Sequence, residues 1–149
     1  MLSKTCKTAI KAVIYLCSKF ENGENASIKE VAEFINASEH TVGKILQTLV
    51  KQDVIKSMKG PNGGFFISKL QKKQPIINIV EAIDGKQAFK SCGLGLSKCS
   101  SKHPCPIHKD YKEARDLMEK LFREKNVQNL CEPVSEGFCL LYTSDAADE

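Results

Sequence analysis

The sequence predicts a mainly α-helical protein that carries one small β-hairpin and ends in a long helix. Three observations indicate this fold class. Apolar residues recur at helical spacing along most of the chain, and a Gly-Pro-Asn-Gly-Gly run at 60–64 lies between β-favouring residues. In addition, 149 residues with 42% hydrophobic and 27% charged side chains can bury one ordinary core. We therefore expect a single domain with an appended arm.

The first predicted helix covers residues 5–20, where apolar positions recur at helical spacing with lysines between them. No small-residue cleavage site follows it, and no run approaches the roughly 18 apolar residues of a membrane span. We therefore expect a cytoplasmic protein, in which clustered cysteines more often serve metal binding or redox chemistry than structural disulfides. Outside the main cysteine cluster, Cys6, Cys17 and Cys131 are interpreted as buried thiols.

Two short helices follow, joined by a tight turn. Ser27 and Glu30 form a capping box at the start of one, and Ser38 can cap the other. The second of these helices has an apolar stripe, and its opposite face carries His40, Thr41, Lys44, Gln47, Thr48 and Lys51. This pattern is typical of a helix-turn-helix, although helical hairpins also occur without any role in DNA binding.

The next segment favours the DNA-binding interpretation. Residues 54–68 read as a hairpin around the glycine-rich turn, and a helix-turn-helix followed by such a hairpin is a winged helix. Residues 41–73 contain seven lysines and a single acid, Asp53, although the whole chain nets only +4. Positive charge concentrated on these elements is the electrostatic footprint expected for binding to phosphates.

Residues 75–84 predict a further helix, with Gly85 as its terminating glycine. After the cysteine-rich segment, residues 109–131 predict a long charged helix with a narrow apolar stripe, formed by Tyr111, Ala114, Leu117, Met118, Leu121 and Phe122. A helix of this kind is well suited to pairing two protomers. The alternative is that the stripe packs on its own domain.

The segment CGLGLSKCSSKHPCPIH, residues 92–108, places three cysteines and a histidine in a stretch poor in apolar residues. Cys92, Cys99, Cys105 and His108 are candidate ligands, because thiolates suit iron–sulfur clusters, zinc or copper(I). The close cysteine pairs that structural zinc sites favour are missing, so an iron–sulfur cluster is the leading interpretation and zinc or no metal are the alternatives.

The order of elements, together with GPNGGFFIS in the hairpin, IVEAIDG after it and the cysteine segment, resembles a family of bacterial winged-helix regulators. The iron–sulfur cluster regulator IscR and the nitric-oxide-sensitive repressor NsrR belong to this family, and the similarity covers residues 1–131. It implies a homodimer on palindromic promoter DNA, with an iron–sulfur cluster that controls DNA binding. By this resemblance Cys92, Cys99, Cys105 and His108 hold the cluster, 2Fe–2S in preference to 4Fe–4S.

From these inferences we expect a transcriptional regulator, a redox sensor or repressor, and not an enzyme. The residues predicted to contact promoter DNA are Ser38, His40, Thr41, Lys44, Lys56, Lys59 and Asn62. Two other classes remain open: a small electron-transfer protein with an iron–sulfur cluster, and a zinc-stabilised DNA-binding or adaptor protein.

The predicted organisation has five parts. A DNA-binding domain covers 1–73, a connecting helix and linker 74–91, a cluster-binding loop 92–108, a dimerisation helix 109–131 and a disordered tail 132–149. The end of the tail, residues 139–149, reads CLLYTSDAADE and resembles a translated sequencing adapter, so we interpret these residues as non-native.

Overall fold

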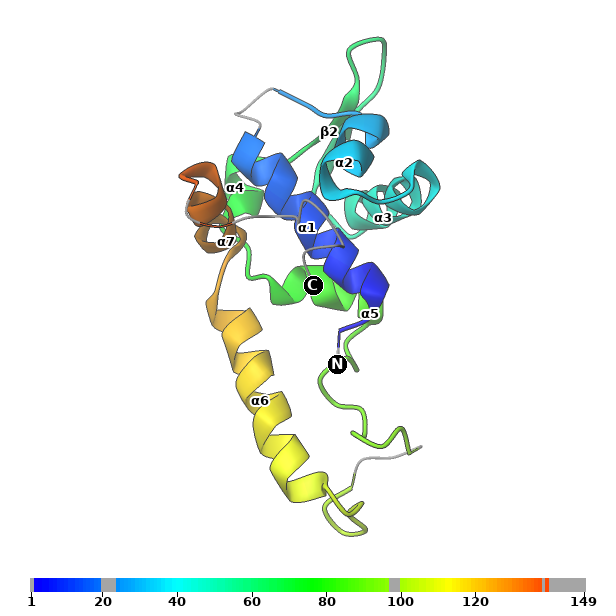
Figure 1. Ribbon diagram of the computed structural model, residues 1–149, viewed down its shortest axis with the longest axis vertical. Helices are drawn as coiled ribbons and strands as arrows, with labels where there is room; N and C mark the ends of the chain where they lie inside the picture. The colour runs from blue at the N-terminus through cyan, green and yellow to red at the C-terminus, as the bar shows by residue number, and fades with distance from the viewer. Residues whose placement is uncertain (1, 20–23, 97–99, 138, 140–149) are drawn as a thin grey trace, which may run out of the picture.

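The structure, a computed structural model, describes residues 2–19, 24–96, 100–137 and 139 (Figure 1). Its elements are α1 (Lys4–Lys19), α2 (Ile28–Ile35), α3 (Glu39–Lys51), β1 (Lys56–Met58), β2 (Gly64–Phe66), α4 (Lys69–Lys72), α5 (Ile77–Asp84), α6 (His108–Glu124) and α7 (Val127–Ser135). The predicted class, a mainly helical winged helix-turn-helix with a small two-stranded sheet, is confirmed. None of the helices described here is long and apolar enough to cross a membrane.

Helix α1 lies at the centre of the helical body and contacts α2, α3, α5 and α7. Its apolar positions are buried as the sequence predicted, apart from the half-buried Ile10, and Phe20, at the end of the predicted helix, lies outside the described residues. The largest fully buried side chains come from α1, α2, α3, α5, α7 and the segment before β1, and include Leu16, Leu46, Leu49, Ile55 and Ile79. This core fixes α3 against the body.

The helix-turn-helix forms as its capping residues predict. The Ser27 hydroxyl accepts from the Glu30 backbone N–H at 3.1 Å, and the Ser38 hydroxyl accepts from the Thr41 N–H at 3.1 Å. Between the two helices Asn36 adopts a left-handed conformation with φ of 55°, which asparagine tolerates better than most residues. The turn therefore ends α2 and lets α3 start within three residues.

The wing is the antiparallel pair of β1 and β2, in register Lys56↔Phe66, Ser57↔Phe65 and Met58↔Gly64. The segment before α2 adds a bridge that the sequence did not reveal. The Ala26 N–H donates to the Phe65 carbonyl at 2.9 Å, and the Phe65 N–H donates to the Ala26 carbonyl at 2.8 Å. Because these bonds attach β2 to the body, the base of the wing has a fixed direction.

Helix α4 was not predicted, because the sequence analysis assigned no element between the hairpin and the helix that starts near Pro75. Ser68 and Gln71 form a complete capping box that starts this single turn. The Gln71 side-chain amide also donates to the Asp53 carbonyl at 3.0 Å, just past the end of α3. The polar side chain of Gln71 is thus buried with its hydrogen bonds satisfied, and it holds the chain after the wing against the end of α3.

The predicted long helix over 109–131 is interrupted. Helix α6 ends at Glu124, and Asn126 caps α7, accepting from the Asn129 N–H at 2.8 Å. The chain turns there, so α7 lies against α1 while α6 extends away from the body (Figure 1). Helix α7 continues to Ser135, four residues into the predicted tail, and residues 140–149 lie outside the described residues.

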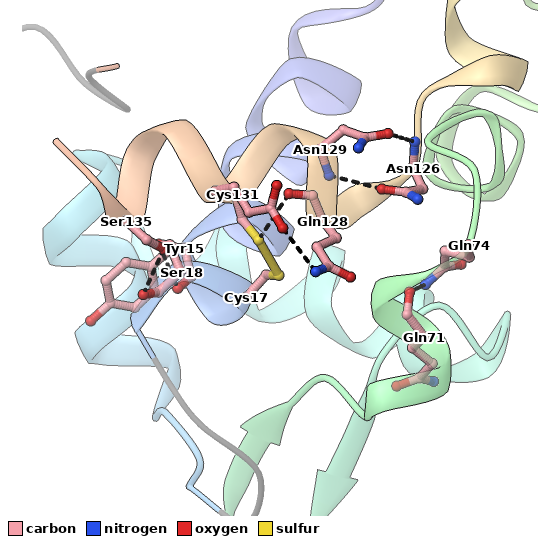
Figure 2. The surroundings of a disulfide bond; sticks show 11 residues. Tyr15, Cys17, Ser18, Gln71, Gln74, Asn126, Gln128, Asn129, Cys131 and Ser135 are labelled. Carbon is pink, nitrogen blue, oxygen red and sulfur yellow. Dashed lines mark hydrogen bonds between the residues drawn. A yellow bond between two sulfur atoms is a disulfide. The ribbon is translucent and has the colours of Figure 1, made fainter. Parts of the chain in front are cut away.

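Cys17 on α1 and Cys131 on α7 form a disulfide, with Cα atoms 6.0 Å apart (Figure 2). The sequence correctly predicted that both residues are buried, but it treated them as separate thiols. Their separation of 114 residues left no local pattern to reveal the pairing. Cys6 is a buried free thiol, as predicted, and burial beside Asp84 raises its pKa to about 12.

Candidate nucleic-acid interface and cysteine loop

The residues predicted to contact DNA lie exposed on α3 and on the wing. Ser38, His40, Thr41 and Lys44 occupy the N-terminal half of α3 and its cap. The Ser38 hydroxyl accepts from one backbone N–H and donates to the Thr41 hydroxyl at 2.8 Å, so it orients the start of the helix. The structure therefore gathers these four side chains at one helix end, where the helix dipole also attracts phosphate.

The remaining predicted residues are exposed on the wing. Lys59 and Asn62 flank the turn, and Lys56 on β1 lies 3.9 Å from the Asp53 carboxylate. The Asn25 side chain donates to the Asn62 carbonyl at 2.9 Å and so braces the wing tip. Between α3 and the wing lies an open groove of about 430 Å³, lined by Gln47, Val50, Lys51, Ser57, Met58, Lys59, Gly64 and Phe65.

Helix α1 contributes residues that the sequence analysis did not assign to this surface. An open cavity of about 510 Å³ joins its first turns to the start of α3, lined by Lys4, Thr5, Thr8, Lys11, Ile35, Asn36, Ala37, Ser38 and Thr41. The lysines had been read only as the polar face of an amphipathic helix. Their position beside α3 depends on how α1 crosses it, which local sequence does not report.

The wing turn leads to a first prediction, on Gly63. A methyl group there would collide with the Met58 carbonyl oxygen and lie 2.9 Å from the Gly60 carbonyl oxygen. We expect Gly63→Ala to open the turn and weaken duplex binding by roughly 1–2 kcal/mol, with little change in the urea midpoint. Fluorescence anisotropy and urea unfolding measure the two effects. Pro61→Ala, in the same exposed turn, is the control, and parent-like binding by Gly63→Ala would contradict the prediction.

The cysteine loop lies at the far end of the long axis from the wing (Figure 1). Cys92 is buried, and the Leu94 N–H donates to its sulfur at 3.4 Å. The pKa of the Cys92 thiol lies below its usual value, chiefly because the N–H groups of Leu94 and then Leu96 stabilise the thiolate, while burial acts in the opposite direction. A hydrogen bond with Cys105 contributes in the same direction as the N–H groups.

The predicted ligands are thus partly assembled. Cys92 and Cys105 lie together. The backbone N–H of His108, at the start of α6, donates to the backbone carbonyl of Cys105 at 3.0 Å. Cys99 lies outside the described residues. Within the described part of the chain, no three His, Cys, Asp or Glu side chains gather as a metal site. Two neighbouring thiols, one with a lowered pKa, suit a group bound through sulfur.

Contacts at the start of the loop, at residues 89–93, attach it to α6. The buried Arg115 guanidinium donates to the Ser91 carbonyl at 2.7 Å. The Tyr111 ring lies directly against Gly93, where a methyl group would come within 2.7 Å of the ring. Before the loop, Phe89 meets Phe122 of α6 edge to face, with ring centroids 5.4 Å apart. Any change in the loop therefore acts first on α6.

The apolar stripe of α6 is partly buried against the body and partly exposed to solvent. Phe122 is buried against the body, and Arg123 reaches Glu81 of α5 at 3.5 Å. Leu117 and Leu121 stay 69% and 44% exposed, with Leu94, Leu96 and Ile107 of the loop region also exposed. Part of the stripe thus packs on its own domain, while an apolar strip remains on the outer surface of this chain.

A mainly helical winged fold with a lysine-rich recognition helix and wing defines a winged-helix transcriptional regulator. The family model of Rrf2, described as an iron-dependent transcriptional regulator, matches residues 2–133, and the chain belongs to this family. The chain is 23% identical over 141 residues to the regulator NsrR of Oceanobacillus iheyensis, covering 94% of this chain and 95% of that protein. The family consists of transcriptional regulators rather than enzymes.

Solved structures agree with this fold. CymR, the global cysteine regulator of B. subtilis, matches with a TM-score of 0.71 at 17% identity, over 89% of this chain and 96% of that one. The IscR of T. potens matches with a TM-score of 0.70 at 16% identity, over 94% of this chain and 92% of the other. The relationship to regulators such as IscR and NsrR is therefore confirmed.

Proposed function

We propose that this Rrf2-family regulator acts as a homodimer in the cytoplasm and binds promoter DNA under the control of an iron–sulfur cluster. One observation carries the proposal. A lysine-rich reading surface on α3 and the wing lies at one end of the molecule, and a thiol-bearing loop fixed to α6 lies at the other (Figure 1). This division separates a DNA-binding part from a sensing part within one chain.

On the DNA side, α3 supplies the base-reading residues. His40, Thr41 and Lys44 are placed at or near base edges in the major groove, and Ser38 orients them from the N-cap. Lys56, Lys59 and Asn62 of the wing contact phosphates or the minor groove. Lys4 and Lys11 extend the phosphate contacts, because they line the same cavity as the start of α3.

This assignment gives a prediction for Lys4 and Lys11. We expect Lys4→Ala and Lys11→Ala each to weaken binding to all duplexes alike, because a phosphate contact carries no sequence information. Each change should lower the slope of log affinity against log salt by about one. Lys90→Ala, a change of an exposed lysine remote from α3, is the matched control. A loss confined to the selected operator would show that these lysines read bases instead.

The dimer is proposed to form through the outer surface of α6. Leu117 and Leu121 present apolar area that α6 does not bury against its own body. Pairing two such helices removes this area from water and places two recognition helices on one duplex, as palindromic sites require. The exposed leucines therefore favour the dimer-forming interpretation of the helix.

At the other end, Cys92, Cys99, Cys105 and His108 are proposed to hold the cluster, 2Fe–2S in preference to 4Fe–4S, with zinc as the alternative. The donor set suits such a group, because the Leu94 N–H already stabilises the Cys92 thiolate. When bound, an iron–sulfur cluster supplies a centre whose charge and occupancy respond to electrons and oxidants. Metal–thiolate bonds would also order a loop that buries little apolar surface.

The loop can pass its state to the dimer helix through this chain's own contacts. Tyr111 and Arg115 project from α6 onto residues 91–93, directly before and after Cys92. A rearrangement around Cys92 must therefore shift these two side chains or the helix that bears them. The proposed switch is a change in how the paired α6 helices position the two copies of α3 and the wing on DNA.

The test is selection of duplexes from a random library by protein purified without oxygen, followed by binding measurements with and without bound iron. We expect an inverted-repeat site, binding that falls steeply with salt, and an affinity that depends on iron content. Equal affinity for random duplex would refute the regulator and favour the electron-transfer class. A colourless protein that contains zinc would favour the zinc-stabilised class.

A further inference from the structure

The disulfide between Cys17 and Cys131 joins the DNA-binding domain to the C-terminal helices at a point distant from the cysteine loop (Figures 1 and 2). Both residues are nearly buried, at 7% and 4% exposure, yet both line an open cavity of about 390 Å³. The bond is therefore shielded by the protein on most sides but can be reached by a small molecule from one side.

Lysines dominate the rest of this cavity. Its remaining lining residues are Lys69, Lys72, Lys73, Gln128, Glu132 and Ser135. The one carboxylate among them, on Glu132, accepts from the Gln128 side chain at 2.8 Å. Positive charge attracts anionic reactants and favours the thiolate form of cysteine, which is the form that attacks a disulfide.

The bond adds a covalent link to the packing of α7 against α1. Helix α7 is held to α1 by the disulfide and by the Ser135 hydroxyl, which donates to the Ser18 carbonyl at 3.2 Å (Figure 2). At its start, the Val127 N–H donates to the Gln74 carbonyl at 3.0 Å. The two residues between α6 and α7 are also fixed, because the Ile76 N–H donates to the Lys125 carbonyl at 2.9 Å, so a change at the disulfide is expected to act on α7 itself.

We propose that Cys17 and Cys131 form a redox-active pair that exchanges with small anionic thiols and their disulfides through this lysine-lined opening. In the oxidising direction, one cysteine thiolate attacks the small disulfide and releases one thiol. The second cysteine then attacks the resulting mixed disulfide and releases the other thiol, so one small disulfide becomes two thiols and Cys17–Cys131 forms. In the reducing compartment where the proposed regulator would meet DNA, disulfides are usually of this transient kind.

The test measures the redox state of the full-length protein by alkylating thiols before and after reduction and identifying the labelled peptides by mass spectrometry. Each buffer contains one small thiol together with its own disulfide. The thiols are 3-mercaptopropionate, which is anionic, 2-mercaptoethanol, which is neutral, and cysteamine, which is cationic. The rate at which each thiol reduces Cys17–Cys131 is divided by the rate at which the same thiol reduces hydroxyethyl disulfide, which corrects for the intrinsic reactivity of the thiol. We expect Cys17 and Cys131 to change state together, and the anionic thiol to react about tenfold faster than the cationic one at low salt.

The matched variants separate charge from structure. Lys69→Gln/Lys72→Gln/Lys73→Gln should remove the preference for the anionic thiol, whereas Lys86→Gln/Lys90→Gln, at exposed positions elsewhere, should retain it. Cys6, buried and with its pKa raised, should be found as a thiol in every buffer. Hydrogen exchange in α7 should rise on reduction.

Two results would overturn the proposal: Cys17 and Cys131 remaining in one state across all buffers, or rates that do not depend on the charge of the thiol. Both readouts are independent of DNA and iron. A failure here would therefore leave the proposed regulator standing, and a failure of selective DNA binding would leave this thiol chemistry standing.

Discussion

Replacing Cys92, Cys99 and Cys105 together by alanine is expected to remove all visible colour and all bound iron and sulfide from anaerobically purified protein. Three of the four proposed ligands are lost, and a single imidazole cannot retain a cluster. Operator affinity or operator choice should change in the same variant, because the loop loses the bonds that would order it against α6. Absorbance spectra, metal and sulfide analysis and operator binding measure these effects.

Two further variants sharpen this result. His108→Ala should retain a weaker and more labile cluster, because three thiolates remain. Cys139→Ala, which changes an exposed thiol outside the proposed ligand set, should keep colour and iron at the parent level. If parent protein prepared without oxygen contains neither iron nor sulfide, the cluster is refuted. If the triple variant binds every operator as the parent does, the loop does not control DNA binding.

Replacing Leu117 and Leu121 by aspartate is expected to convert the proposed dimer into a folded monomer. Four acids in a paired apolar surface would be brought together without partners, which opposes association. Each monomer then binds one half-site without help from the other, so affinity for a full operator should fall by roughly 100-fold. Analytical ultracentrifugation and operator titration measure the two effects.

The control introduces the same charges on another side of the helix. Lys109→Asp changes the charge by the same two units as the two leucine substitutions together, at an exposed position away from Leu117 and Leu121, and should leave the dimer intact. The leucine variant should still unfold in one cooperative urea transition, since neither leucine is buried in its own domain. A leucine variant that sediments as the parent does would show that α6 is not the dimer surface.

Local sequence was sufficient for the elements whose signals are local. Ser27, Ser38 and the glycine-rich turn each mark a boundary within a few residues, so the helix-turn-helix and wing could be predicted. The Ser68 to Gln71 capping box and the Asn126 cap are equally local, but they were passed over. The first starts a helix of only four residues directly after the hairpin, and the second interrupts an otherwise continuous helical pattern.

The rest depends on contacts between distant segments. The pairing of Cys17 with Cys131 and the placing of Lys4 beside α3 follow from how α1 crosses the core, and no spacing in the sequence encodes that crossing. The same holds for Tyr111 against Gly93, which requires the loop to fold back on α6. The predicted ligand set remains a prediction, because Cys92 and Cys105 lie together but Cys99 falls outside the described residues.

The opposite placement of the wing and the cysteine loop along the molecule bears on how such a protein can be altered (Figure 1). The contacts of Ser91 and Gly93 are made with Arg115 and Tyr111 of α6, so we expect insertions between Gly93 and His108 to leave the side chains of α3 in place. A different receptor loop could therefore be grafted between Ser91 and His108 while the operator stays the same. We therefore expect that the proposed signal and the operator could be exchanged independently in an engineered reporter.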